Sequence, residues 1–302
     1  MTTIFPRPLR QGDKIAILSP ASIIDPALVD GAAKAISALG WEPIVMPHTT
    51  GHHGSYSGSA DNRLTDMEAA LTDPEVRAIL CSRGGYGAVH LLDKLDRIID
   101  RNDPKWLIGF SDISALHALW HRHGIASVHA SMARHLALFP ADDAANSAVI
   151  GLLRDGTIPS LRWNSDSRNR TGSATGRIKG GNLAVLAGLI GTPYDMLRPG
   201  DILFIEDIAE PIYKVERILY QLKLSGVLAN LRGLVTGAFT QYTPDANYRT
   251  MEDMIAEMTA PYGYPVAMHA PIGHIDQNMP VVQSAEMTLT VTDSGASLTT
   301  AI

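Results

Sequence analysis

Residues 106–113, Trp-Leu-Ile-Gly-Phe-Ser-Asp-Ile, contain the change from strand to helix that decides the fold. The apolar run Trp106–Phe110 is typical of a buried strand. After it, apolar residues recur at helical spacing from Asp112 to about Trp120, namely Ile113, Leu116, Leu119 and Trp120. A buried strand that leads directly into an amphipathic helix is the repeating unit of an α/β protein. We therefore expect Ser111 to lie on a strand-to-helix turn.

The same alternation of strands and helices fills the first half of the chain. We expect strands at residues 14–18, 43–46 and 76–80. Helical patterns lie between them, at residues 26–39, around 62–71 and after Gly87. Strands that are separated by helices imply a parallel sheet covered on both faces.

The alternation stops between about Asp155 and Thr175, where polar residues and glycine dominate and Trp163 is the only large apolar side chain in the middle. We take residues 156–175 as a linker between a domain at 1–155 and a smaller domain at 176–302. The second domain is expected to be mixed α/β, with helices near 183–190, at 212–224 and near 251–258 and strands at 201–205 and 234–239. Alternating residues at 287–291 and 296–300, separated by Asp293-Ser294-Gly295, predict a closing β-hairpin.

Composition narrows the class of protein. A chain of 302 residues with 45% hydrophobic and 19% charged residues can bury a full core. Its formal net charge of -6 argues against nucleic acid and anionic membrane surfaces as partners. The single cysteine, Cys81, excludes an internal disulfide and a cysteine-based metal cluster. With no apolar leader in residues 1–10 and no membrane-length apolar run, we expect a cytoplasmic protein.

Ser111 is a candidate nucleophile. A helix N-terminus has unpaired N–H groups and partial positive charge, so the N–H of Asp112 could stabilise the oxyanion of an acyl-transfer intermediate. The alternative is that Ser111 or Asp112 simply caps the helix, and the local pattern alone favours the cap. Ile113 also replaces the second glycine of Gly-x-Ser-x-Gly, so the stretch is not the α/β-hydrolase elbow.

A glycine-rich turn, Arg83-Gly84-Gly85-Tyr86-Gly87, follows the expected strand at 76–80. It lies at the same carboxyl-terminal edge of the sheet as Ser111, where open α/β sheets bind ligands. Glycines let the backbone approach a ligand and offer N–H groups to an anion. The turn does not have Rossmann or P-loop spacing, and ordinary turn chemistry explains it about as well.

A serine nucleophile needs a histidine base, and the histidine needs a carboxylate to fix its tautomer. Among eleven histidines, His274 lies in a polar turn after a strand-like run. Glu206 follows the strand expected at 201–205, which would direct its carboxylate toward the cleft. Composition does not choose among the acids.

Taken together, these stretches resemble the L,D-carboxypeptidase family of serine peptidases, which includes the microcin C self-immunity hydrolases. The resemblance extends over most of the chain. Its motifs occur in family order, at residues 19–22 (Ser-Pro-Ala-Ser), 83–87, 109–112, 180–183 (Gly-Gly-Asn-Leu), 203–207, Glu210 with 215–217 (Val-Glu-Arg), and Gly273-His274. The sequence departs from the family at Met279-Pro280-Val281-Val282, where relatives often have Leu-Pro-x-Gly.

The resemblance implies a flavodoxin-like N-terminal domain, a smaller C-terminal domain and a homodimer. It assigns Ser111 as nucleophile, Glu206 as orienting acid and His274 as general base, and it places an oxyanion hole at the backbone of Gly84, Gly85 and Asp112. No metal or cofactor is implied. The implied substrate is murein tetrapeptide, which loses its terminal D-alanine during peptidoglycan recycling. An aminoacyl-nucleotide antibiotic is the alternative, and candidate substrate-binding residues are Arg83, Tyr86 and Arg217.

Three other interpretations stay open. A zinc enzyme could use His117 and His121, which are four residues apart on the expected helix, with His123, His129 or His135 as a third ligand. A cysteine hydrolase would use Cys81. A non-enzymatic protein would bind a small molecule at the glycine turn, with Ser111 as a helix cap.

Overall fold

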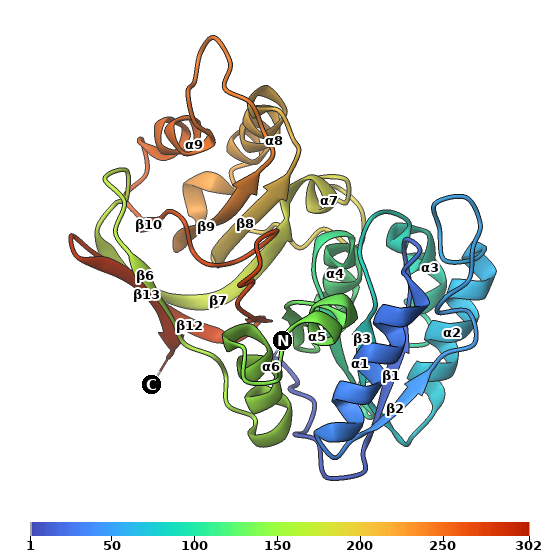
Figure 1. Ribbon diagram of the computed structural model, residues 1–302. Helices are drawn as coiled ribbons and strands as arrows, with labels where there is room; N and C mark the ends of the chain where they lie inside the picture. Colours follow the sequence, from blue (N-terminus) through green and yellow to red (C-terminus); the bar gives the residue numbers. More distant parts are fainter. Residues whose placement is uncertain (1, 302) are drawn as a thin grey trace. The chain divides into compact units, whose positions relative to one another are not determined.

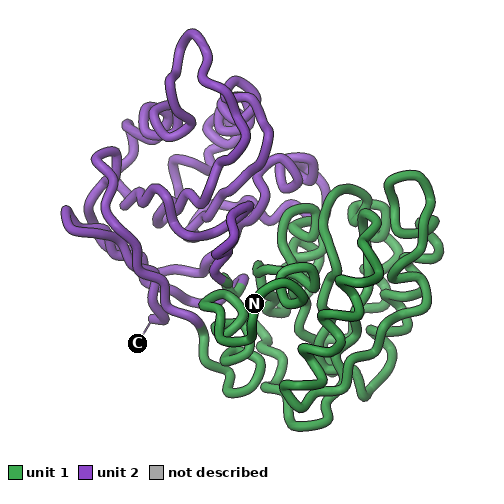
Figure 2. Tube along the Cα trace, in the orientation of Figure 1, with its two compact units in different colours: residues 1–158, 280–282 green, residues 159–279, 283–302 purple. Residues whose placement is uncertain are grey.

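The computed structural model describes residues 2–301, which form two compact units (Figure 2). Unit 1 contains the chain up to Ile158 together with Pro280–Val282, and unit 2 contains Pro159–Met279 and the residues from Gln283 onward. Among residues 2–301, no helix has both the length and the apolar character needed to cross a bilayer.

Unit 1 is built on a six-stranded sheet in the order β11-β5-β4-β3-β1-β2 (Figure 1). Its strands are β1 (Lys14–Leu18), β2 (Glu42–Val45), β3 (Val76–Cys81), β4 (Trp106–Gly109), β5 (Ser127–His129) and β11 (Val281–Gln283). The pairs from β2 to β5 are all parallel. The order 2-1-3-4-5 is that of flavodoxin-like folds, so the expected fold of this part is confirmed.

Helices cover both faces of this sheet. They are α1 (Pro26–Ala38), α2 (Ala60–Thr72), α3 (Leu92–Leu95), α4 (Ser114–Arg122), α5 (Ala133–Leu138) and α6 (Ala144–Asp155), with 3₁₀ turns η1 (Ala88–Leu91) and η2 (Ser111–Ile113). Side chains of α1, α5 and α6 pack with Ile15, Leu80 and Ile108 of the strands on one face. The helices α2, α3 and α4 contact one another in a separate layer. The strands are therefore buried on both sides, which explains their continuous apolar runs.

Unit 2 contains a seven-stranded mixed sheet in the order β10-β9-β8-β7-β12-β13-β6. Its strands are β6 (Leu161–Asn164), β7 (Gly172–Asn182), β8 (Ile202–Ile208), β9 (Gly233–Thr240), β10 (Val266–Ala267), β12 (Glu286–Thr292) and β13 (Gly295–Thr300). The four strands β7 to β10 are parallel, whereas β12 and β13 form the expected antiparallel hairpin. The helices are α7 (Leu183–Ala187), α8 (Ile212–Leu224) and α9 (Met251–Thr259), with the 3₁₀ turn η3 (Leu228–Asn230).

Residues 156–175, which we expected to form a linker, contain β6 and the first part of β7. The boundary between the units lies instead between Ile158 and Pro159. Leu161 is buried in β6, and the indole N–H of Trp163 donates to the carbonyl of Met268 at 2.8 Å. The strands have few apolar residues here because most of their side chains are exposed or half-buried. In composition alone, these strands therefore resemble a linker.

The long strand β7 gives a direct test of this packing, at Gly180. A Cβ added there would lie 1.7 Å from the carbonyl oxygen of Phe204 on β8, which is backbone and has little freedom to move. We expect Gly180→Ala to lower the free energy of unfolding by about 3 kcal/mol or more. Urea unfolding followed by the fluorescence of Trp163, the tryptophan of unit 2, measures this loss.

Gly263→Ala is the matched control, because a Cβ at Gly263 meets no atom within 4 Å. We expect that substitution to change the free energy of unfolding by less than about 0.5 kcal/mol. Equal stability of the two variants would contradict the close β7–β8 contact.

Candidate active site

Ser111 lies at the expected strand-to-helix turn, but it does not cap the helix. It has a φ of 64° and is the first residue of η2, which leads directly into α4. This left-handed backbone costs a residue with a side chain roughly 1–2 kcal/mol. The N-cap positions of η2 and α4 are occupied by Phe110 and Ile113, neither of which has a polar side chain. The cap interpretation of Ser111 therefore does not describe this turn, and strained residues of this kind cluster at functional sites.

Residues around the turn keep Ser111 in its strained backbone conformation. A Cβ on Gly109 would lie 2.9 Å from Cγ1 of Ile113, so only glycine lets the helix start this close to the end of β4. His117 lies with Nε2 2.8 Å from the carbonyl oxygen of Gly109 and Nδ1 2.8 Å from the hydroxyl of Ser127. Burial lowers the pKa of His117 to about 4, so its ring is neutral. His117 therefore supports the turn with both ring nitrogens, which a zinc ligand could not do.

The glycine turn lies beside Ser111 in the same unit. A Cβ on Gly84 would lie 2.9 Å from Cβ of Ser111, 3.1 Å from its hydroxyl oxygen and 3.3 Å from the backbone nitrogen of Asp112. Gly84 therefore leaves open the space in front of the hydroxyl and the N–H group that we expected to form the oxyanion site. Arg83 is exposed and Tyr86 is 55% exposed at the same turn.

Cys81, at the end of β3, is fully buried. Burial, with a smaller contribution from Asp112, raises the pKa of its thiol well above the ordinary value. A thiol in this state is protonated and shielded from substrate, whereas a cysteine nucleophile has to be an accessible thiolate. The structure thus argues against Cys81 as the reactive group.

Unit 2 brings Glu206 and His274 together. Nδ1 of His274 lies 2.8 Å from Oε2 of Glu206, and the carboxylate is 0% exposed. A carboxylate at Nδ1 fixes the tautomer in which Nε2 carries no proton and can act as a base. Burial raises the pKa of Glu206, and the hydrogen bond from His274 partly offsets that rise.

The position of Glu206 in its strand differs from our expectation. The strand β8 continues to Ile208, so Glu206 lies inside it rather than after its end. The pairing of β8 with β9 shifts register between Ile205 and Asp207, opposite Gly237. Such irregularities change the direction of a side chain at the edge of a site, and no local sequence pattern predicts one here.

Two glycines make room for the carboxylate. A Cβ on Gly273 would lie 2.8 Å from Oε2 of Glu206, and a Cβ on Gly237 would lie 3.2 Å from Cβ of Glu206. Gly273 also has a φ of 110°, a conformation that favours glycine. The Gly273-His274 pair of the sequence motif therefore acts as one unit, in which the glycine admits the acid that holds the histidine.

Asn278 closes the loop that carries His274, and our reading of the sequence missed it. The side-chain oxygen of Asn278 accepts a hydrogen bond from the N–H of Gly273 at 2.8 Å, and the residue is fully buried. The N–H of Met279 donates to the carbonyl of Pro271 at 2.8 Å. These two hydrogen bonds define the shape of the loop. The sequence alone did not predict that shape, because Val282 stands where relatives often have glycine.

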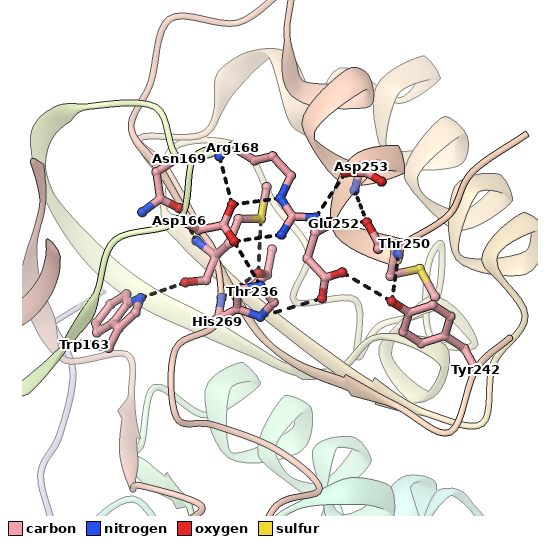
Figure 3. A network of polar contacts seen from close by, with 12 residues as sticks. Trp163, Asp166, Arg168, Asn169, Thr236, Tyr242, Thr250, Glu252, Asp253 and His269 are labelled. Carbon is pink, nitrogen blue, oxygen red and sulfur yellow. Dashed lines mark hydrogen bonds and ion pairs between the residues drawn. The ribbon is translucent and has the colours of Figure 1, made fainter. Parts of the chain in front are cut away.

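A polar network holds the segment that precedes this loop (Figure 3). Nε2 of His269 lies 3.2 Å from Asp166, and its Nδ1 lies 3.7 Å from Glu252 on α9. Hydrogen bonds from Arg168 hold the pKa of Asp166 well below its usual range. His269 itself has a φ of 60°, so the network fixes a strained residue five positions before His274. Its members come from distant segments, which is why no local motif predicts it.

The remaining substrate-binding candidate, Arg217, is exposed on α8, with its guanidinium 5.5 Å from the centre of the Tyr213 ring. Each unit thus gathers part of the predicted site. Unit 1 contains Ser111, Asp112 and the turn at 83–87, and unit 2 contains Glu206, His274 and Arg217.

Comparison with known proteins identifies the class of both units. Residues 15–130 match the model of the LD-carboxypeptidase N-terminal domain, and residues 175–289 match that of the LD-carboxypeptidase C-terminal domain. The murein tetrapeptide carboxypeptidase of Pseudomonas aeruginosa is 31% identical over 277 residues, which cover 88% of this chain and 89% of that protein. These matches define a two-domain peptidase. The chain belongs to the LD-carboxypeptidase family.

Solved structures agree with this assignment. The muramoyltetrapeptide carboxypeptidase of Oxalobacter formigenes superposes with a TM-score of 0.83 at 26% identity, covering 94% of this chain and 97% of that one. The microcin self-immunity protein MccF, solved with aspartyl sulfamoyl adenosine, has a TM-score of 0.82 at 20% identity, covering 99% of each chain. At that identity MccF shows the shared fold and no more.

The strain at Ser111 can be measured without substrate. Glycine adopts a φ of 64° freely and alanine does not, so we expect Ser111→Gly to be more stable than Ser111→Ala by about 1 kcal/mol. Urea unfolding followed by tryptophan fluorescence compares the two variants.

The matched pair is Ser147→Gly and Ser147→Ala, at an exposed position inside α6. There the order should reverse, with alanine more stable by about 1 kcal/mol, because glycine is a poor helix former. The same order at both positions would show that the backbone of Ser111 is not strained.

Proposed function

We propose that this protein is a serine carboxypeptidase that removes the terminal D-alanine from murein tetrapeptide, with Ser111, Glu206 and His274 as its triad. The observation that carries the proposal is the buried Glu206–His274 hydrogen bond of 2.8 Å. A histidine fixed in this way can act as a general base, and Ser111 has a left-handed backbone on a strand-to-helix turn, where an α/β protein can present a nucleophile. The murein tetrapeptide carboxypeptidase of Pseudomonas aeruginosa supports the choice of substrate.

In the proposed acylation step, Nε2 of His274 takes the proton of the Ser111 hydroxyl as its oxygen attacks the carbonyl carbon of the terminal amide. The negative charge that develops on the carbonyl oxygen is stabilised by backbone N–H groups of Asp112 and the Gly84-Gly85 turn. His274 then gives its proton to the leaving nitrogen, and D-alanine departs.

In the proposed deacylation step, His274 takes a proton from water, and the hydroxide attacks the ester that Ser111 has formed. Collapse of this second intermediate returns the proton to Ser111 and releases the shortened peptide. Glu206 stays ionised in both steps and stabilises the imidazolium that forms each time. The chemistry needs no metal or cofactor.

The candidates for substrate recognition are two exposed side chains of the glycine turn and one arginine of unit 2. Murein peptides carry several carboxylates, and an arginine binds a carboxylate through two parallel hydrogen bonds. Arg83 and Tyr86 are exposed beside Gly84 and Gly85, so they would hold the peptide near the reacting bond, and Arg217 is the candidate in unit 2. We further propose that the enzyme works in the cytoplasm as a homodimer.

The triad predicts a specific pattern of loss. Ser111→Ala and His274→Ala should each lower kcat for murein tetrapeptide by roughly 10⁴-fold or more, and their double variant should be no slower, because the two residues act as one unit. Release of D-alanine, measured with a coupled assay, gives these rates. The exposed Ser147→Ala serves as the control and should keep wild-type activity.

The assay is run side by side with an aminoacyl sulfamoyl adenylate. Turnover of tetrapeptide alone supports the proposed substrate. Turnover of the adenylate alone, with the same losses in the variants, would replace the substrate and keep the triad. Full activity of Ser111→Ala would overturn the triad itself.

A further inference from the structure

The carboxylate of Asp112 joins the nucleophile turn to the glycine turn. Asp112 follows Ser111 directly and is 3% exposed. Its Oδ2 accepts a hydrogen bond from the N–H of Ala88 at 2.8 Å. The backbone of Asp112 lies near Gly84, at the other end of the same turn. One residue therefore contacts both ends of the segment 84–88.

A buried arginine holds the glycine turn from its other side. Arg63, on α2, is 2% exposed. Its Nη1 donates to the carbonyls of Gly87 at 2.8 Å and Pro20 at 2.7 Å. A Cβ on Gly87 would lie 2.8 Å from this Nη1, so the glycine is needed for the contact. The peptide group between Gly87 and Ala88 is thus held by a carboxylate at the N–H of Ala88 and by a guanidinium at the carbonyl of Gly87.

The charged side chains of Asp112 and Arg63 are both buried and both contact the segment 84–88. The positive charge of Arg63 favours the ionised form of Asp112, while burial disfavours it. Other titratable groups that face the pair are Cys81, which is protonated, and His90, whose Nδ1 lies 3.2 Å from Nη2 of Arg63. Charges buried in this way are costly to maintain and are weak evidence for a purely stabilising role.

We propose that Asp112 and Arg63 are positioning residues, whose ionised side chains set the place of the Gly84–Gly87 turn against the Ser111 hydroxyl. This proposal rests on the proposed function. An ionised carboxylate accepts the hydrogen bond from the N–H of Ala88 more strongly than a protonated acid or an asparagine does, because hydrogen bonds to a charged group are stronger. Loss of the charge therefore loosens the turn that would hold the oxyanion.

Protonation of Asp112 should have the same effect as its substitution. Burial raises the pKa of Asp112 to about 6, so wild-type enzyme has the ionised form at pH 7.5 and mostly the neutral form at pH 5. The ratio of the wild-type rate to the rate of an Asp112 variant cancels the pH dependence that the two proteins share and isolates the contribution of this carboxyl group.

The test compares Asp112→Asn with wild type on murein tetrapeptide between pH 5 and pH 8. We expect kcat to fall at least about tenfold at pH 7.5 with KM changed less than about twofold, as for a weakened oxyanion site. The ratio of the two kcat values should shrink to below about threefold at pH 5. Asp66→Asn is the matched control, because Asp66 is also 3% exposed and accepts two hydrogen bonds, both from His48.

A ratio that stays constant across this pH range, or equal kcat values at pH 7.5, would overturn the proposal. Amide hydrogen exchange gives a readout that does not depend on activity. Exchange in residues 84–88 should be faster in Asp112→Asn than in wild type and unchanged in Asp66→Asn. If Asp112→Asn does not fold, Arg63→Gln replaces it, with the same expected exchange and kcat losses.

These outcomes separate the two proposals. Wild-type enzyme that does not cleave the tetrapeptide, or active Ser111→Ala, would refute the proposed function while faster exchange in Asp112→Asn would still show the positioning contact. Unchanged exchange in that variant would refute the positioning role even if the triad holds.

Discussion

The left-handed backbone of Ser111 is the constraint on which the proposed site depends. Ser111 lies two residues after the end of β4, whose residues are all buried, so a well-packed strand positions its hydroxyl. Gly109 allows the helix to start close behind it, and Gly84 leaves its front uncovered. The strain is tolerated because the buried sheet and the neutral His117 hold the turn from behind.

The constraint in unit 2 is different, because a carboxylate has to be buried there while it keeps its negative charge. Glu206 is fully buried, and its partner is the imidazole of His274. Gly237 and Gly273 provide the space, and Asn278 fixes the loop that carries the histidine. In the proposed mechanism, this carboxylate stabilises the protonated histidine that forms during the reaction. The network around His269 adds rigidity to the same segment.

The sequence predicted elements whose signals are local. The helix Ile212–Leu224 and the β12–β13 hairpin follow from periodicity and turn residues, and Glu206 and His274 from the ordered family motifs. It did not predict features that depend on contacts between distant segments. The register shift at Glu206 and the strand β6 are set by pairing with neighbours, so residues 161–164 looked like part of a linker. Likewise, the φ of Ser111 is imposed by packing, whereas its type and position alone favoured a helix cap.

In the proposed site, His274 of unit 2 activates Ser111 of unit 1. This activation can be measured as the rate at which a serine-directed covalent probe, such as a fluorophosphonate, labels the wild type and His274→Ala, with the modified peptide mapped by mass spectrometry. We expect one adduct per chain, on Ser111, and labelling at least about 100-fold slower in His274→Ala. Equal labelling rates, or an adduct on another residue, would refute the proposed activation.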